Sequence, residues 1–505
     1  MAISPSIREF TRCYNNGESQ LVWESFANNN LEPVVAMEKL AGESEYHLLY
    51  ESALGGKAAR YSIIAMDPEI IWKCENNRAK ICRISSDKKT KKLQETFFSE
   101  KKAPFSSLRE LLKKTQLKIP KSLPQMASGI FGYMSYDMVR LMEKLPDKNP
   151  DKINIPQAVY FRPRVIVIFD SEQKKIHIIS SVFCDKKKSA DDAYKKAEER
   201  IRKTKEKLKN NIYKSAKVKI KNIKVGPFVS GDNEEIYSDV VARAREYVFA
   251  GDICQVVPSR RWKGDFNLPA LELYKSLREL NPSPYLFYIK LGDFSLVGSS
   301  PEILVRVKDN KVTIRPIAGT RRRGKNKKED EYLAEELLSD EKEISEHLML
   351  LDLGRNDVGR VAKPGTVKVT EKMIVEKYSH VMHIVSNVEG SLDADKDSID
   401  ALIAGFPAGT LTGAPKIRAM EIIDELEKER RSFYGGTVGY FSSNGNMDTC
   451  IAIRTGLVKN KKLYIQAGGG VVADSVEHDE FMETENKARA VIKAAEMAKQ
   501  RYEGN

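Results

Sequence analysis

A lysine-rich stretch from residue 186 to residue 224 divides the sequence into two parts. Within it, residues 190–208 combine helix-forming residue types with few strong apolar residues, which predicts an exposed helix leading into a connector. A chain of 505 residues also exceeds the usual size of a single hydrophobic core. We therefore predict an N-terminal domain at 1–208, a basic connector at 209–226 and a C-terminal domain at 227–505.

Both parts mix β-rich and helical segments, which predicts an α+β fold. In the first part, β-rich segments at 164–170 and 176–181 flank a short polar stretch, a pattern typical of a hairpin. In the second part, Gly292-Asp293 separates the segments 285–291 and 294–297 in the same way. Further strands are predicted at 253–257, 303–307, 312–317, 436–441, 449–455 and 463–466, and helices between 233 and 251 and at 330–353, 415–426 and 479–498.

Composition narrows the class of protein. With 41% hydrophobic and 31% charged residues the chain is typical of a globular protein, and no apolar run is long enough to span a membrane. The first residues lack the order of a signal peptide, and the six cysteines are scattered without a Cys-x-x-Cys pair. We expect a cytoplasmic protein with reduced cysteines and no membrane association.

The net charge of +13 leaves two interpretations. Basicity favours anionic small substrates, whereas a binding module would contact nucleic acid through the lysine-rich stretch. Aromatic residues are not interleaved with those lysines, and no nucleic-acid recognition motif accompanies them. We therefore expect no nucleic-acid partner and keep the binding module as an alternative.

Two predicted helices each carry carboxylates on one face. Glu343 and Glu346 lie three residues apart in the first, and Glu480, Glu483 and Lys487 share a face of the second. The buried stripe of the first helix is predicted to be Ile344, Leu348 and Leu351. Carboxylates from two helices could hold Mg²⁺, which takes a few protein oxygens and leaves the rest of its octahedron to substrate and water. Solvated acidic faces are the other interpretation.

Three further segments could approach a ligand. Gly468-Gly469-Gly470 follows a predicted strand, where backbone without side chains allows either close approach or a tight turn. Arg454 lies in an alternating run at 451–455, so an interior arginine would pair with a substrate carboxylate or form a structural salt bridge. Residues 409–416 end at a helix start, whose free N–H groups can bind a carboxylate.

Ordered motifs extend along nearly the whole chain. They are Gly251-Asp-Ile-Cys-Gln-Val-Val257, Asn281-Pro-Ser-Pro-Tyr-Leu-Phe287, Gly298-Ser-Ser-Pro-Glu302, Arg315-Pro-Ile-Ala-Gly-Thr320, the run 346–357, Pro407-Ala-Gly-Thr410, Gly413-Ala-Pro-Lys416 and Asn446-Met-Asp-Thr-Cys450. Together they resemble the chorismate-utilising enzymes, and among them the anthranilate synthase component I family. This resemblance implies a large antiparallel β-sandwich flanked by helices. It also implies a lyase of tryptophan biosynthesis that converts chorismate and ammonia into anthranilate and pyruvate.

The resemblance also implies the ligand contacts. Glu346 and Glu483 would bind Mg²⁺, supported by Glu343 and Glu480, and the metal would hold the ring carboxylate of chorismate. Arg454 would pair with the enolpyruvyl carboxylate. The implied substrate-binding residues are Gly319, Thr320, Thr410, Tyr434, Arg454, Gly468, Gly469, Gly470 and Lys487.

Proton-handling residues are implied by the family's reaction, in which ammonia adds at C2 while the C4 hydroxyl leaves, and pyruvate is then lost. Glu302 is the candidate general acid, because a carboxyl in a dry site can have its pKa raised towards neutrality. His383 is the candidate for the elimination step. His380 lies three residues earlier, and either histidine could instead bond to a buried polar group.

Two positions separate the sister families. Aminodeoxychorismate synthases of folate biosynthesis commonly carry a lysine that forms a covalent adduct where this chain has Ala318. Isochorismate and salicylate synthases place a water-activating lysine where this chain has Gln255, and an amide cannot deprotonate water. We therefore predict ammonia as the nucleophile, with an aminodeoxychorismate synthase lacking the lysine as the alternative.

An inhibitor site and a partner complete the expectations. Residues 48–52 and 60–62 resemble the segment that binds tryptophan as feedback inhibitor, with a pocket formed by Ser52, Pro284, Tyr285 and Leu286. The chain has no segment resembling a glutamine amidotransferase with its glycine-flanked cysteine. Use of glutamine would therefore need a separate small subunit.

Overall fold

The computed structural model describes residues 3–42, 44–52, 60–84, 96–210, 220, 222–378 and 381–503. In this part of the chain, twenty-one strands form one continuous sheet, and β10 and β19 form a separate antiparallel pair. The strands are β1 (Gln20–Ala27), β2 (Tyr46–Glu51), β3 (Tyr61–Glu75), β4 (Arg78–Arg83), β5 (Phe98–Ser99), β6 (Gly129–Met134), β7 (Ala158–Asp170), β8 (Lys175–Val182), β9 (Val229–Ser230), β10 (Gln255–Val256), β11 (Ser259–Asp265), β12 (Tyr285–Leu291), β13 (Phe294–Ser300), β14 (Ile303–Lys308), β15 (Lys311–Ile314), β16 (Ile317–Arg322), β17 (Lys368–Lys377), β18 (Val381–Ser391), β19 (Gly413–Ala414), β20 (Thr437–Ser442), β21 (Met447–Ile451), β22 (Thr455–Lys459) and β23 (Lys462–Gly468).

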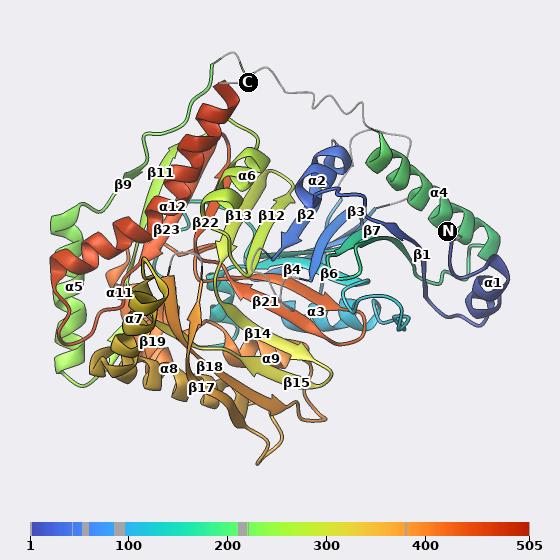
Figure 1. Cartoon of the computed structure of the whole chain (residues 1–505). Helices are drawn as coiled ribbons and strands as arrows, with labels where there is room; N and C mark the ends of the chain where they lie inside the picture. The colour runs from blue at the N-terminus through green and yellow to red at the C-terminus, as the bar shows by residue number, and fades with distance from the viewer. Residues whose placement is uncertain are drawn as a thin grey trace.

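Helices cover both outer faces of the sheet (Figure 1). They are α1 (Ile7–Asn15), α2 (Pro33–Ala41), α3 (Pro104–Lys113), α4 (Ala190–Lys209), α5 (Glu234–Phe249), α6 (Ala270–Leu280), α7 (Lys327–Ser339), α8 (Glu341–Gly359), α9 (Ser398–Gly405), α10 (Gly409–Thr412), α11 (Lys416–Leu426) and α12 (Glu477–Glu503), with a 3₁₀ turn at Tyr136–Leu141.

The sheet branches at β7, which pairs antiparallel with β8, β3 and β6. From β3 one arm runs through β2, β12, β13, β22 and β23 to β11. From β6 the other arm runs through β20, β21, β14 and β15 to β18, which also pairs with β16 and β17. These pairings are all antiparallel, as expected for the family's sheet.

Three apolar clusters divide the molecule into four layers, helix, sheet, sheet and helix. The central cluster is built from strands of both arms and connecting loops, including Leu48, Phe161, Phe287 and Leu457. One outer cluster packs α1, α2, α4, α6 and α12 on one arm, and the other packs α3, α8, α9 and α10 on the other arm. The expected β-sandwich flanked by helices is therefore confirmed.

Strand pairing continues across the predicted domain boundary. β2 pairs with β12, and β6 pairs with β20, so backbone hydrogen bonds join segments on either side of the connector. A helix is present at 190–208 as predicted, α4, and its N-cap Ser189 accepts a hydrogen bond from the backbone of Asp192. It is not exposed all round, because Ile201 and Leu208 are buried in an outer apolar cluster. Residues 211–219 and 221 of the connector lie outside the described residues. The domain limits themselves stay a prediction.

Most predicted elements are confirmed, and several differ. The strand predicted at 312–317 is broken, because β15 ends at Ile314 and β16 begins at Ile317. The hairpins β7–β8 and β12–β13 lie where the turn residues indicate. The helix predicted at 330–353 is two helices, because Asp340 ends α7 and caps α8 by accepting from the backbone of Lys342 and Glu343. Leu348 is 41% exposed, so its predicted place in the buried stripe of α8 is wrong. The strand predicted at 253–257 contains only the two residues of β10.

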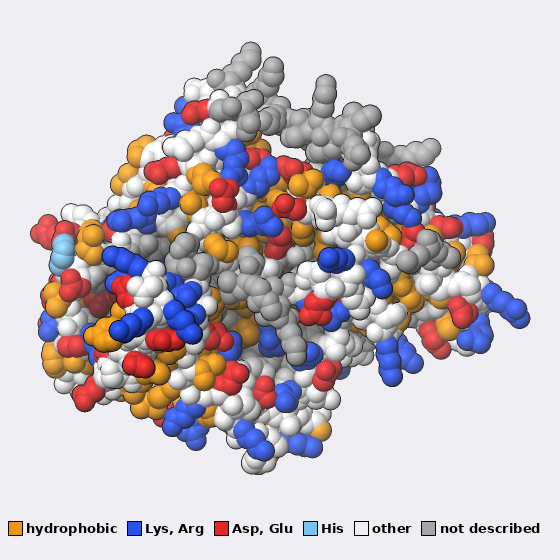
Figure 2. Space-filling view, in the orientation of Figure 1, with side chains coloured by type: hydrophobic (Ala, Val, Ile, Leu, Met, Phe, Trp, Pro, Cys, Tyr) orange, Lys and Arg blue, Asp and Glu red, His pale blue; other side chains and the backbone are white. Residues whose placement is uncertain are grey.

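Positive charge is dispersed on the visible face, where Lys and Arg side chains alternate with Asp and Glu (Figure 2). Many of these charges are paired, as in Lys203 with Glu199 and Arg202 with Glu206 along α4. Among the described residues, no helix combines the length and the apolar character needed to cross a bilayer.

Candidate active site

Two acidic helices contribute carboxylates to one place. On α8, the Oε1 atom of half-buried Glu346 accepts a hydrogen bond from Gln255 Nε2 at 3.2 Å. Burial raises the pKa of Glu346, and the nearby carboxylates of Glu343 and of Glu483 on α12 raise it further. Glu346 and Glu483, from helices distant in sequence, therefore lie close enough to repel each other.

On α12, Glu480 is buried beside Glu483. Burial raises the pKa of Glu480 to about 7, and the charge of Glu483 raises it as well. Ser475 Oγ donates to Glu480 Oε1 at 2.8 Å, whereas the buried Oε2 atom has no hydrogen-bond partner among the described residues. An unsatisfied buried carboxylate oxygen is costly, so this atom is suited to bond a ligand group.

Lys487 is the central cation of the site. Its Nζ atom lies 2.5 Å from Glu483 Oε1 and donates to the carbonyl oxygen of Gly468 at 2.9 Å. Its charge also lowers the pKa values of Glu302, Glu346 and Glu480, against the larger effect of burial. One ammonium group therefore lies within electrostatic reach of carboxylates from α8, α12 and the start of β14.

The glycine run at the end of β23 lies close against its neighbours. A Cβ atom on Gly469 would lie 2.5 Å from Glu480 Oε2, and one on Gly470 would lie 2.5 Å from Gln255 Nε2. A Cβ atom on Gly468 would lie 2.6 Å from Pro258 O. Any side chain here would displace the carboxylate or amide groups of the site, so close approach decides the residue type.

Arg454 does not lie in a strand. β21 ends at Ile451 and β22 begins at Thr455, so the single strand predicted at 449–455 is wrong. Arg454 has a φ of +49°, a conformation that residues other than glycine rarely adopt. Such conformations are concentrated at functional sites, where the surrounding structure holds them in place.

The guanidinium group of Arg454 has no hydrogen bond or ion pair with any described residue, so no structural salt bridge is found for it there. Burial lowers the pKa of Arg454, and the neighbouring charged or polar groups are Tyr434 and Glu483. Arg454 lines a cavity of about 510 Å³ with Glu483 and Lys487. A cation without a partner beside a cavity is suited to bind an anion.

Glu302 is a buried carboxyl group just before β14. Burial raises the pKa of Glu302 to about 8, so its side chain is mostly protonated at neutral pH. Thr410 Oγ1 of α10 lies 3.1 Å from Glu302 Oε1 and donates a hydrogen bond to it. The raised pKa is that expected of a general acid, and the catalytic role stays a prediction.

His383 on β18 has a defined tautomer. Its Nδ1 atom lies 2.9 Å from the carbonyl oxygen of Gly319 and 3.1 Å from Thr320 Oγ1. Because a carbonyl oxygen only accepts hydrogen bonds, Nδ1 carries the hydrogen and Nε2 is left as an acceptor. Burial lowers the pKa of His383, so the ring is neutral near pH 7. His380 lies outside the described residues.

Gly319 and Tyr434 connect these groups to the rest of the site. Gly319 has a φ of +66°, and a Cβ atom there would lie 3.1 Å from Glu343 Oε2. Tyr434 is buried, and a Cβ atom on Gly468 would lie 3.0 Å from its hydroxyl oxygen. The residues predicted for chorismate and for the metal are thus brought together, although their roles stay predictions.

The described residues contain no group of three or more His, Cys, Asp or Glu side chains arranged to hold a metal ion. Mg²⁺ commonly takes one or two protein carboxylates and completes its octahedron with substrate oxygens and water. The mutual repulsion of Glu346 and Glu483 fits a divalent cation held in this way. The magnesium site stays a prediction.

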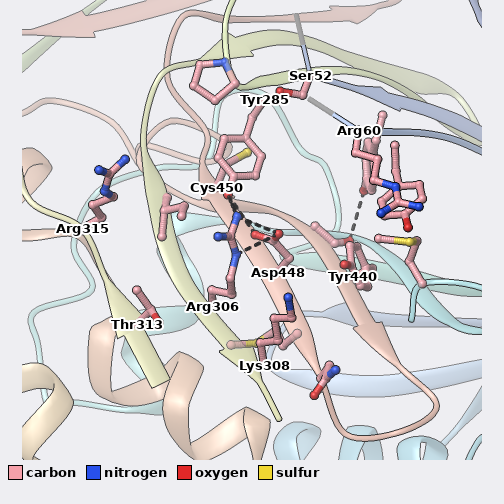
Figure 3. Close-up of a pocket in the computed structure, with 18 of the residues that line it drawn as sticks. Ser52, Arg60, Tyr285, Arg306, Lys308, Thr313, Arg315, Tyr440, Asp448 and Cys450 are labelled. Carbon is pink, nitrogen blue, oxygen red and sulfur yellow. Dashed lines mark hydrogen bonds and ion pairs between the residues drawn. The ribbon is translucent and has the colours of Figure 1, made fainter. Parts of the chain in front are cut away.

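A larger cavity of about 1670 Å³ contains the predicted inhibitor residues Ser52, Pro284, Tyr285 and Leu286 in its lining. Figure 3 shows Arg306 and Asp448 next to Tyr285 in this cavity. The hydroxyl of Tyr285 donates to Asp448 Oδ1 at 2.9 Å and accepts from Arg306 Nη2 at 2.9 Å. The four predicted residues therefore lie together, and tryptophan binding stays a prediction.

Two groups of residues were not predicted from the sequence. Arg306 and Asp448 lie opposite each other on the paired strands β14 and β21. The only sequence signal is that Arg306 stands between Val305 and Val307, a polar–apolar alternation that predicts a different face of the strand for the arginine. Tyr378, which packs against His383, follows β17 without any distinguishing pattern. Arg306 and Asp448 depend on contact between distant segments, whereas the contact of Tyr378 with His383 depends on the local path of the chain from β17 to β18.

Known proteins are similar to this chain over most of its length. The profile of the family described as chorismate binding enzyme matches residues 67–493. The chain is 47% identical to anthranilate synthase component 1 of Cereibacter sphaeroides over 98% of both chains. It is 41% identical to that of Aquifex aeolicus over 100% of both chains. Anthranilate synthase component I from Streptococcus pneumoniae has a similar solved structure, with a TM-score of 0.75 and 35% identity, covering 93% of this chain and 99% of that chain.

Proposed function

The chain belongs to the chorismate binding enzyme family, and from that premise we propose that it converts chorismate and ammonia into anthranilate and pyruvate as the large subunit of an anthranilate synthase. One observation carries the proposal: carboxylates of α8 and α12 lie near the guanidinium of Arg454, which has no partner among the described residues. Such a site matches a substrate that has two carboxylates and reacts with a neutral nucleophile.

The two substrate carboxylates would have different partners. Arg454 would pair with the enolpyruvyl carboxylate, because its planar guanidinium is suited to bidentate bonding. Mg²⁺, when held by Glu346 and Glu483, would supply the positive charge that neutralises and positions the ring carboxylate. Lys487 and the backbone of Gly468–Gly470 would complete the contacts with the substrate.

Proton transfer would fall to two residues. Glu302, mostly protonated at pH 7, would give its proton to the C4 hydroxyl as that group leaves and ammonia adds at C2. His383, with Nε2 unprotonated, would take a ring proton as pyruvate is eliminated. At pH 7 Glu302 holds a proton that it can donate, and His383 Nε2 is free to accept one, so the two residues suit an acid and a base that act in turn.

Gln255 supports ammonia as the nucleophile. Its amide cannot deprotonate water, and Nε2 bonds to Glu346 while the buried Oε1 atom has no partner among the described residues. The alternative, an aminodeoxychorismate synthase, is less well supported, because Ala318 offers no amine for a covalent adduct.

We further propose a glutamine amidotransferase small subunit as partner and L-tryptophan as an inhibitor that binds in the larger cavity. We also propose a cytoplasmic location, which fits the scattered cysteines. Mixing with the small subunit should add glutamine-dependent activity to an ammonia-dependent activity of the chain alone. Turnover of glutamine by the purified chain alone would exclude the need for that partner.

The direct test is incubation of the chain with chorismate, ammonium and Mg²⁺ while anthranilate fluorescence is followed. We expect fluorescence to grow with time, and mass analysis separates anthranilate from a para-amino product. Absence of any product, together with a salt-sensitive shift on nucleic acid, would favour the binding module instead.

A further inference from the structure

Tyr378 lies between the larger cavity and His383. It follows the last residue of β17, and its ring packs edge to face against the imidazole of His383, with ring centroids 5.5 Å apart. Tyr378 also lines the larger cavity, and Glu302 lies close enough to act on its pKa. The residue therefore contacts one proposed proton-handling group and lies near the other.

The position of Tyr378 is held by three hydrogen bonds. Its backbone N–H donates to Val381 O at 2.8 Å, and its carbonyl oxygen accepts from the guanidinium of Arg323. Its hydroxyl donates to Glu376 Oε2 at 2.8 Å. Glu376 lies directly opposite His383 in the β17–β18 register, and Arg315 donates to its other oxygen at 2.6 Å. Backbone and side chain are thus both restrained.

The imidazole of His383 is in turn held on two sides. Nδ1 bonds to Gly319 O on β16, and the ring of Tyr378 packs against it from the end of β17. Rotating the imidazole by half a turn would replace Nδ1 by a carbon and lose the bond to Gly319. The ring of Tyr378 hinders such rotation, because the turning imidazole would collide with it on the way between the two positions.

We propose that Tyr378 is a positioning residue that keeps His383 in the orientation in which Nδ1 bonds to Gly319 and Nε2 is left to handle a proton. The proposal rests on the proposed function for the role of His383. A small displacement of a proton-handling group lowers catalytic rate more than substrate affinity, because it acts on the reacting geometry.

The surroundings of His383 predict a readout that a purely structural role would not change. The charged groups that act on it are Glu376 on β17 and Arg454, while Arg321 on β16 is bonded to Glu336, Asp340 and Glu343. Burial is the main cause that lowers the pKa of His383 below the ordinary 6.5. Removal of the Tyr378 ring admits water, which raises the pKa towards that value, whereas loss of the bond to Gly319 would lower it. Because burial is the larger of the two effects, the net change expected is a rise.

The test compares Tyr378→Leu with Tyr378→Phe, which keeps the ring and loses only the bond to Glu376. For Y378L we expect kcat to fall about tenfold with KM within about threefold, and for Y378F kcat within about threefold of wild type. We also expect the NMR titration of the His383 ring, assigned by comparison with His383→Asn, to move to higher pH in Y378L alone.

An unmoved His383 titration in Y378L overturns the proposal, whatever happens to kcat. Equal losses of kcat in Y378F and Y378L also overturn it, because they would assign the effect to the Glu376 bond. If Y378L does not fold, Tyr378→Met removes the ring with an unbranched side chain and carries the same expectation. The NMR titration does not require catalytic activity, so it tests the proposed role of Tyr378 even if the wild type forms no anthranilate.

Discussion

Glu302 is buried and Arg454 is half-buried, and neither side chain has an ion pair to a described residue. The consequences for the two groups differ. Glu302 becomes mostly neutral at pH 7, whereas an arginine keeps its charge under all ordinary conditions. Each group therefore suits its proposed task, a proton donor in one case and a fixed anion-binding charge in the other.

Glu302→Gln should separate catalysis from stability. Loss of the proton donor should lower kcat at pH 7 about 100-fold with little change in KM, and should remove the decline of kcat above about pH 8. A wild-type kcat in E302Q would contradict the assignment of the general acid.

The same variant also tests the pKa of Glu302. Between the ordinary pKa of 4.5 and about 8 the folded wild type holds a proton that the unfolded chain has released, so its free energy of unfolding falls as pH rises. Glutamine does not ionise, so the melting temperature of E302Q relative to wild type should increase from pH 5 to pH 9. A constant difference would show that the pKa of Glu302 is not raised.

Arg454→Met should stabilise the protein while it abolishes substrate binding. Replacing a half-buried charge that has no partner among the described residues by an apolar side chain should raise the free energy of unfolding by about 1 kcal/mol. Loss of the carboxylate partner should lower kcat/KM for chorismate at least about 100-fold. Arg489→Met, at an exposed position on α12, is the control and should leave both quantities unchanged. Turnover by R454M close to wild type would remove Arg454 from the site.

At the scale of elements, α8 and α12 bring like charges together. Glu483 on α12 raises the pKa of Glu346 on α8, and neighbours on the same helix do so as well, Glu343 for Glu346 and Glu483 for Glu480. The helices are anchored by different apolar clusters, α8 on the side of β14 and β18 and α12 on the side of β23. Packing of both helices against the sheet therefore outweighs the repulsion, which a bound cation would relieve.

Glu483→Gln tests the proposed use of that repulsion. Wild type should gain melting temperature when Mg²⁺ and chorismate are added together, because ligands that bind only the folded state stabilise it. E483Q should lose this gain and about 100-fold in kcat/KM. Glu496→Gln changes the same charge at an exposed position of α12 and should behave as wild type. Full activity and full stabilisation in E483Q would contradict the metal assignment.

At the scale of the molecule, segments from both sides of the connector build the larger cavity. Ser52 follows β2, whereas Tyr285 and Leu286 begin β12, the strand with which β2 pairs. The cavity is also lined by Pro301 and Ile303, the two residues that flank Glu302. A ligand in this cavity would therefore contact the chain on both sides of the proposed general acid.

L-Tryptophan should raise the melting temperature of wild type and lower its rate of anthranilate formation. Ser52 Oγ is buried without a partner among the described residues, so a ligand hydrogen bond to it should contribute about 1 kcal/mol. Ser52→Ala should then weaken tryptophan binding about fivefold by calorimetry, with uninhibited kcat unchanged. Ser44→Ala, in the loop before β2, is the control. Equal affinity in S52A and wild type would place the inhibitor elsewhere.

Much of the fold follows from short-range patterns. The polar residues 171–175 and Gly292-Asp293 indicated the hairpins β7–β8 and β12–β13, because a turn and its flanking alternation lie within a few positions. The division of 330–353 into α7 and α8 was not predicted, because an aspartate at position 340 is equally compatible with an exposed position inside one helix and with the N-cap of a second helix. Leu348 and the strand at 449–455 were wrong because tertiary packing overrode local periodicity.

The sequence alone determined the mixture of strands and helices, the pairs of carboxylates on α8 and α12, and, through its motifs, the resemblance to chorismate-utilising enzymes. Only the tertiary structure decided that Glu346 and Glu483 lie close together, that Arg454 has no partner among the described residues, and that burial brings the pKa of Glu302 to about 8. The physical reason is the separation along the chain over which each effect acts. Periodicity and capping act over a few residues, whereas burial and electrostatic contact depend on segments more than a hundred positions apart and on the exclusion of water between them.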